Sequence, residues 1–138
     1  MADDGKLTVR YCPFDYVNLG ARVLIVGITP GLHQMFLSCQ AAQRALARGL
    51  EGDDVRREAC DVASFAGSMR SNLVAMLDGV GLHEVLDLAT VSQLFGERSD
   101  LLHSTSALLY PVFLRGRNYG GSPAPRPSHY CGPSSIRC

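Results

Sequence analysis

The sequence lacks an excess of charge of either sign. Its 138 residues include 13 Lys and Arg and 13 Asp and Glu, giving a formal net charge of +0 at pH 7. Because the chain has no global field to attract nucleic acid, any phosphate contact would come from a local basic patch. Hydrophobic residues make up 46% of the chain and charged residues 19%. This composition predicts one domain with a packed core and argues against disorder.

Long apolar runs and paired cysteines are also missing. No segment approaches the roughly 20 apolar residues that a membrane span needs. The start, MADDG, lacks the basic and apolar regions of a signal peptide. The five cysteines include no Cys-x-x-Cys pair, which argues against a structural zinc site. We therefore expect a cytoplasmic protein with no membrane contact, no metal and no organic cofactor.

The most informative segment is residues 23–32, VLIVGITPGL. Four consecutive branched apolar residues predict a strand buried on both faces, as in a parallel sheet. The strand breaks at once into a loop, residues 27–31, and a helical apolar pattern follows. Ligands of open α/β sheets bind where a strand's carboxyl end meets the next helix, because the first N–H groups of that helix are unpaired. Gly27 and Gly31 permit close approach of a ligand and Pro30 stiffens the loop, so it is the candidate site.

The rest of the chain continues an α/β pattern. Apolar spacing and capping residues predict helices over residues 32–46, 53–63 and 68–81, with one or two further turns from Thr90. Residues 101–112 then read as a second extended segment. A strand, three helices and a strand in this order predict two parallel strands joined by a right-handed crossover.

Residues 122–138 have a different character. They contain prolines at positions 123, 125, 127 and 133, and no acidic residue occurs from Tyr110 onward. These prolines exclude a regular helix or a central strand. One interpretation is a basic tail that touches nucleic acid. The other is a reading frame lost near Gly121, because Pro, Arg, Ser and Cys together are typical of a GC-rich gene read out of frame. We therefore divide the chain into a partial α/β domain, residues 1–121, and an anomalous tail, residues 122–138.

Two segments resemble motifs of a known superfamily. Residues 27–32, GITPGL, resemble the first motif of the uracil-DNA glycosylase superfamily, and especially the Gly-Ile-Asn-Pro-Gly-Leu version of mismatch-specific and thymine-DNA glycosylases. Residues 101–111, LLHSTSALLYP, resemble its central strand, which ends in a proline in several branches. The resemblance covers roughly residues 11–120. It implies a three-layer α/β/α fold with a central parallel sheet, incomplete here on its C-terminal side.

The resemblance also implies a function, the hydrolysis of the N-glycosidic bond of uracil or a damaged base in DNA. In relatives an Asp or Asn of the first loop holds the attacking water, and here that position is Thr29. An asparagine of the central strand reads the base edge, and here that position is Thr105. In relatives an aromatic residue stacks on the base, and here Phe14 or Tyr16 could take that role. The alternative is that these two residues cover the end of the sheet. The base-pocket floor would comprise Gly27, Ile28, Pro30 and Gly31, and phosphate contacts would come from Arg115 and Arg117.

The sequence departs from the family pattern in two catalytic features. A threonine hydroxyl can bind a water but cannot accept its proton as a carboxylate does. The late His-Pro motif, whose histidine donates to the base oxygen in relatives, is absent, and His129 is followed by Tyr130. Catalysis by this chain is therefore an open question. Two alternatives remain: a non-catalytic nucleotide or nucleic-acid binding module on the same fold, and an unrelated α/β protein that uses the loop for a phosphate.

Overall fold

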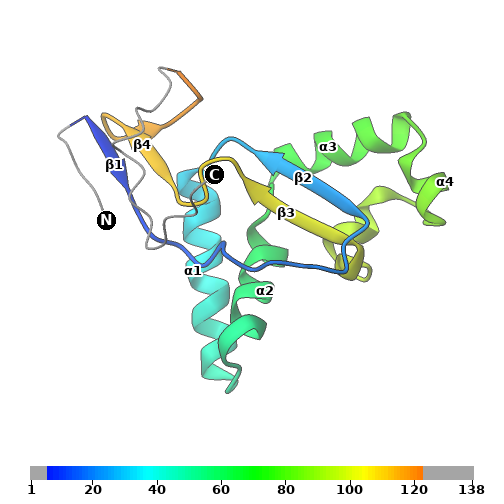
Figure 1. The fold of residues 1–138 in the computed structure, drawn as a ribbon, viewed down its shortest axis with the longest axis horizontal. Helices are drawn as coiled ribbons and strands as arrows, with labels where there is room; N and C mark the ends of the chain where they lie inside the picture. Colours follow the sequence, from blue (N-terminus) through cyan, green and yellow to red (C-terminus); the bar gives the residue numbers. More distant parts are fainter. Residues whose placement is uncertain (1–5, 123–138) are drawn as a thin grey trace.

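The computed structural model describes residues 6–122. Figure 1 shows a mixed α/β fold with short strands and longer helices. In chain order the elements are β1 (Leu7–Val9), β2 (Val23–Gly27), α1 (Leu32–Ala47), α2 (Gly52–Ala63), α3 (Ser68–Gly79), α4 (Leu82–Leu86), the 3₁₀ turns η1 (Val91–Phe95) and η2 (Ser99–Leu101), β3 (Leu102–Ser106), β4 (Val112–Leu114) and β5 (Arg117–Asn118). The anomalous tail, residues 122–138, lies outside this range apart from Ser122, so both interpretations of the tail concern residues that the structure does not describe.

The predicted parallel pair is present. Strands β2 and β3 pair in parallel, from Val23 opposite Leu102 to Gly27 opposite Ser106, and α1 to α4 lie in the connection between them. The prediction of one extended segment over residues 101–112 is wrong, however. Strand β3 ends at Ser106, and the chain enters a different sheet at Val112.

That second sheet was not predicted. It is antiparallel, in the order β1-β4-β5, and its strands are two or three residues long, too short to show an alternating pattern. The β4–β5 hairpin turns through Arg115 and Gly116, whose φ angles are 51° and 76°. A two-residue turn with both φ angles positive suits the twist of a hairpin, but it usually carries Asn-Gly or Asp-Gly.

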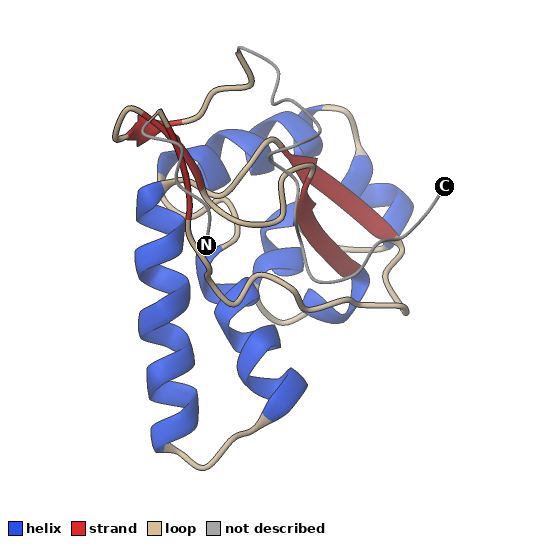
Figure 2. Ribbon diagram, turned by 60° about the vertical axis from the view of Figure 1, so that its left-hand side comes forward, coloured by secondary structure: helices blue, strands red, loops and turns tan. Residues whose placement is uncertain are grey.

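Helical segments cover one face of the parallel pair in the part of the chain described. Val23 and Ile25 pack on an apolar cluster comprising Leu86, Leu88, Val91, Leu94, Leu101 and Leu102. In Figure 2 helical segments lie behind the two strands, while the long helix α1 lies to their left. On the opposite face the side chains of Leu24 and Val26 are 61% and 55% exposed. The expectation of a strand buried on both faces is therefore wrong for residues 6–122, which form an α/β arrangement with helices on one side of the parallel pair.

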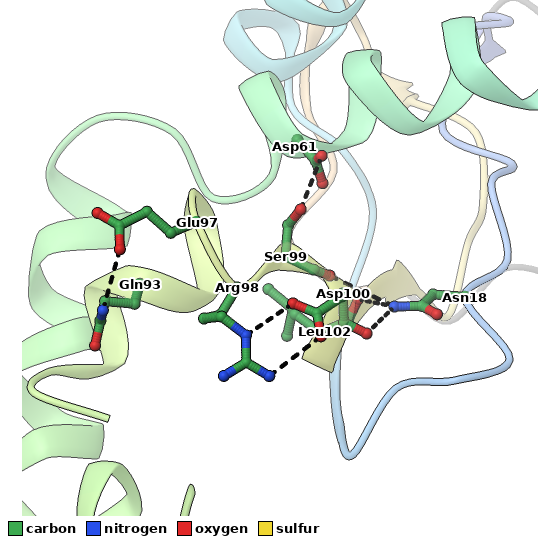
Figure 3. A network of polar contacts seen from close by, with 8 residues as sticks. All are labelled: Asn18, Asp61, Gln93, Glu97, Arg98, Ser99, Asp100 and Leu102. Atoms are coloured by element: carbon green, nitrogen blue, oxygen red, sulfur yellow. Dashed lines mark hydrogen bonds and ion pairs between the residues drawn. The ribbon is translucent and has the colours of Figure 1, made fainter. Parts of the chain in front are cut away.

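Polar contacts fix the ends of the elements in place. The Asn18 side-chain amide donates to the carbonyl oxygens of Asp100 (2.8 Å) and Leu102 (3.0 Å), which fastens the segment before β2 to the start of β3 (Figure 3). The Asp78 carboxylate accepts from Thr90 Oγ1 (2.6 Å) and Val91 N (2.7 Å), which caps η1 from the end of α3. Among residues 6–122 no helix is long and apolar enough to cross a membrane.

Candidate functional site

The loop after β2 and the chain after β3 lie side by side. Because the two strands are parallel, both segments leave the same edge of the sheet. The carbonyl oxygen of Gly27 accepts from Ala107 N (2.9 Å), and that of Ile28 accepts from Leu108 N (2.8 Å). These two hydrogen bonds fasten the first half of the predicted ligand-binding loop, residues 27–31, to residues 101–111, the second segment that resembles a superfamily motif.

Thr29 continues this connection through its side chain. Its hydroxyl donates to the carbonyl oxygen of Tyr110 (3.0 Å) and accepts from Val112 N (3.1 Å). A hydroxyl has one donor and two acceptor positions, so a single lone pair stays free. That lone pair can accept a hydrogen bond from a water, but it cannot orient the water through a second contact. The Thr29 side chain therefore holds the loop against Tyr110, which precedes β4, and Val112, with which β4 begins.

Two N–H groups at the start of α1 already have partners. Gly31 N donates to Gln34 Oε1 (3.2 Å), and Leu32 N donates to Asn118 Oδ1 (3.0 Å). A Cβ atom on Gly31 would lie 2.8 Å from Gln34 Oε1 and 3.1 Å from Asn118 Nδ2. Glycine is therefore needed at position 31 for these two side chains to reach the helix end. An anion at this place would have to displace them.

The remaining pocket-floor residues differ in what they face. Pro30 is buried, whereas the Ile28 side chain is 51% exposed. A Cβ atom on Gly27 would lie 3.4 Å from Ser106 Oγ and 3.7 Å from Phe65 Cε1. Gly27 thus accommodates close packing on the helical side of the sheet. Ile28 is the member of the loop whose side chain is presented to solvent.

The structure places Thr105 and Phe14, two of the predicted base-contacting residues, in different surroundings. Thr105 lies opposite Val26 in the parallel pair and is half-buried, next to the carboxyl edge where the loop begins. The ring of Phe14 is only 7% exposed, within an apolar cluster that includes Cys12 and Cys60. Phe14 would therefore have to leave this cluster to stack on a base. The same burial raises the pKa of each of the two thiols to about 12, so neither is a ready nucleophile.

Arg115 and Arg117 are exposed, as phosphate contacts require. They lie at the turn of the β4–β5 hairpin and not directly after a strand of the parallel pair. The contact from Asn118 to Leu32 brings this hairpin to the amino end of α1. No feature of the sequence indicates this contact, because its two residues are 86 positions apart.

Two hollows occur elsewhere in the part of the chain described. One is a cavity of about 10 Å³ between α2 and β3, with Asp61, Ser64 and Ser104 in its lining, which is room for about one water molecule. The other is an open hollow of about 340 Å³ beside α2, lined in part by Asp54 and Glu58. Neither is lined by residues 27–31. Within residues 6–122 no three His, Cys, Asp or Glu side chains form a group able to hold a metal ion.

Comparison with known proteins gives one relative without a described function. The chain is 37% identical over 119 residues to an uncharacterized protein, YoxB, of Bacillus subtilis (strain 168). The match covers 86% of this chain and 46% of YoxB, so the chain spans about half the length of this curated relative. No protein-family model matches the chain, and no solved structure matches it. Any functional assignment must therefore be argued from the site itself.

Proposed function

We propose that this chain is a uracil-DNA glycosylase-like protein, a DNA-repair hydrolase type that removes uracil or another damaged base from DNA. One observation carries the proposal. The two segments that resemble superfamily motifs, residues 27–32 and 101–111, are 74 positions apart from start to start, yet they meet at one sheet edge. Three contacts join them: Gly27 to Ala107, Ile28 to Leu108 and Thr29 to Tyr110.

The chemistry of this reaction explains why such an edge is suitable. Hydrolysis of an N-glycosidic bond develops positive charge on the sugar and negative charge on the departing base. The base must first leave the stack, at a cost of a few kcal/mol, and lie against a surface that reads its polar edge. Under the proposal the loop 27–31 is that surface and Thr105 faces the base. Arg115 and Arg117 would contact the DNA backbone, and the three-layer α/β/α arrangement is part of the same proposal.

The non-catalytic binding module is the second candidate, and Thr29 is the observation that favours it. Two of the three hydrogen-bonding positions of its hydroxyl are used by the main chain. The chain would then bind an extruded base without orienting a water for attack. Base release by this chain is accordingly expected to be slow compared with binding.

An oligonucleotide with a single uracil separates these functions. Binding is followed by fluorescence anisotropy, and base release by alkaline cleavage at abasic sites, with the same oligonucleotide carrying thymine as the control. Uracil-dependent cleavage supports the glycosylase, and uracil-dependent binding without cleavage supports the module. If neither depends on uracil, and inorganic phosphate alone raises the melting temperature, the loop is a phosphate site and the proposal is wrong.

The hairpin arginines provide a matched test of DNA contact. The double variant Arg115→Ala/Arg117→Ala should weaken binding to uracil and thymine oligonucleotides alike and reduce its salt dependence, because phosphate contacts carry no sequence information. Arg44→Ala/Arg57→Ala removes the same number of positive charges at exposed positions on α1 and α2 and serves as the control for net charge alone. Equal weakening by both variants would contradict a specific role for the hairpin.

A further inference from the structure

An aromatic pair lies at the end of the antiparallel sheet, next to the candidate site. Strands β1 and β4 lie side by side (Figure 1), and a hydrogen bond from Arg10 N to Pro111 O (3.0 Å) extends their pairing by one residue. Tyr11 and Tyr110 come next in this register, and their ring centroids are 5.4 Å apart. Because the carbonyl oxygen of Tyr110 accepts from Thr29 Oγ1, the pair is attached directly to the candidate loop.

Tyr11 is the exposed member of this pair. It is 55% exposed, whereas Tyr110 is half-buried. An aromatic ring that is held against a second ring and open to solvent is a surface on which any nucleobase can stack. Partial burial, and next the Asp15 carboxylate, raise the pKa of Tyr11, so its phenol is neutral at pH 7. Beside a carboxylate, the part of a nucleotide that suits this ring is the neutral base and not the phosphate.

Three arginines supply positive charge to the same sheet. Arg10 directly follows β1, Arg115 and Arg117 lie at the β4–β5 hairpin, and all three are exposed. None of the ion pairs found among residues 6–122 includes one of them. Residues 6–11 and 110–122 contain no acidic residue. The sheet is therefore a local basic surface on a chain that has no net charge.

The hairpin and the aromatic pair are close enough for one short strand of nucleotides to contact both. Leu7 lies in one row with Leu114 and Arg117 across the sheet. Alternation along the strand places Tyr11 on the same face as Leu7. Four residues of an antiparallel strand separate their positions, which is roughly 14 Å. A few nucleotides span this distance, as in other single-strand binding surfaces.

Two features favour an unpaired strand over a duplex. The bases of a duplex already stack on one another, so an exposed ring gains a partner only from a base outside a duplex. In addition, neither of the two hollows is lined by residues 27–31. The candidate edge thus offers little enclosed surface to offset the free energy of pulling a base out of a duplex, and that cost is least for a base in a single strand.

We propose that the substrate of the candidate site is single-stranded DNA. Its phosphates contact Arg115 and Arg117, and one base stacks on Tyr11 as a neighbour of the base that lies beside Thr29. This inference rests on the proposed function for the uracil beside Thr29. Its test uses probes without uracil, so the inference and the proposed function can fail separately.

Fluorescence anisotropy compares three uracil-free probes of equal length: a single strand, the same strand in a duplex, and a strand of abasic residues that keeps the phosphates. The wild-type chain should bind the single strand at least about fivefold more tightly than either of the other two. Equal or tighter binding of the duplex or of the abasic strand would overturn the inference. Uracil-dependent cleavage of a duplex that binds more tightly than the single strand would leave the proposed function standing.

Substitution of Tyr11 provides the second measurement. Tyr11→Ala should weaken binding of the single strand at least about fivefold and leave binding of the abasic strand unchanged, whereas Tyr11→Phe keeps the ring and should stay within about twofold of the wild type. Phe36→Ala is the matched control, because Phe36 on α1 is 59% exposed. Equal losses in Tyr11→Ala and Phe36→Ala would contradict stacking on Tyr11. The comparison of probes uses the wild-type chain, so it decides the matter even if Tyr11→Ala does not fold.

Discussion

Replacing Thr29 by valine should destabilise the fold through the loss of two hydrogen bonds. The substitution keeps the shape of the side chain but removes the donor to Tyr110 O and the acceptor of Val112 N. Val112 is buried and Tyr110 is half-buried, so water replaces the lost partners poorly. A net contribution of about 1 kcal/mol per bond, together with the cost of leaving a buried N–H unpaired, predicts a loss of about 2–3 kcal/mol in the free energy of unfolding.

Urea denaturation followed by far-UV circular dichroism measures this loss. Thr29→Ser is the matched control, because serine keeps the hydroxyl and should cost less than about 1 kcal/mol, mainly from the missing methyl group. If valine and serine destabilise equally, or if Thr29→Val stays within about 0.5 kcal/mol of the wild type, the hydroxyl does not fasten the loop and this reasoning is refuted.

Three further predictions concern other parts of the fold. Hydrogen bonds from the start of η1 lower the pKa of Asp78, so its carboxylate stabilises the fold above about pH 4 and this contribution is lost as the pH falls through the lowered pKa. Asp78→Asn should thus be less stable than the wild type at pH 7, and urea midpoints that fail to converge in acid would contradict this. Arg115→Asn should stabilise by about 0.5–1 kcal/mol in the same assay, because asparagine tolerates a positive φ better; a lower midpoint would count against a strained turn. Alkylation at pH 8, mapped by mass spectrometry, should label the exposed Cys39 but not the buried Cys12 and Cys60, whose pKa values are raised. Rapid labelling of Cys12 or Cys60 would show that the apolar cluster around them is open to solvent.

Helices α1, α2 and α3 and the parallel pairing could be predicted because their causes are local, whereas α4 was not predicted. Gly49, with a φ of 83°, lies just beyond the end of α1, and Gly67, with a φ of 84°, directly precedes α3. Glycine tolerates a positive φ, so such residues mark helix ends in the sequence. The parallel pairing follows from the helical connection, since a crossover of this length returns the chain in the same direction.

The antiparallel sheet and the exposure of Leu24 and Val26 could not be predicted for a different reason. Strands of two or three residues carry no period, and their pairing depends on residues about a hundred positions apart, such as Leu7 and Leu114. The run from Val23 to Val26 is apolar on both faces, which is the pattern of a strand covered twice. Whether another element packs on the second face of the strand depends on residues outside the strand. The apolar pattern of the strand thus indicates that both of its faces could pack against other elements, but not that both of them do.

The candidate site likewise combines local features that the sequence could predict with long-range contacts that it could not. The loop was found from its glycines, proline and preceding strand, which are local features. The partners of Thr29 are main-chain groups of Tyr110 and Val112. Because nearly every residue carries such groups, the sequence does not indicate which of them bind Thr29. Asn118 reaches Leu32 across 86 positions and was likewise beyond sequence reasoning. Such contacts determine which donors of the loop are available to a ligand.

The most direct test of the central claim is to locate the bound base on the chain. Amide chemical shifts are recorded while a short oligonucleotide with one uracil is added, and again with its thymine counterpart. The proposed function predicts that the amides of Gly27, Ile28, Thr29 and Thr105 shift with uracil and much less with thymine. Shifts confined to the hairpin, or identical for both oligonucleotides, would show that the edge beside Thr29 binds no base.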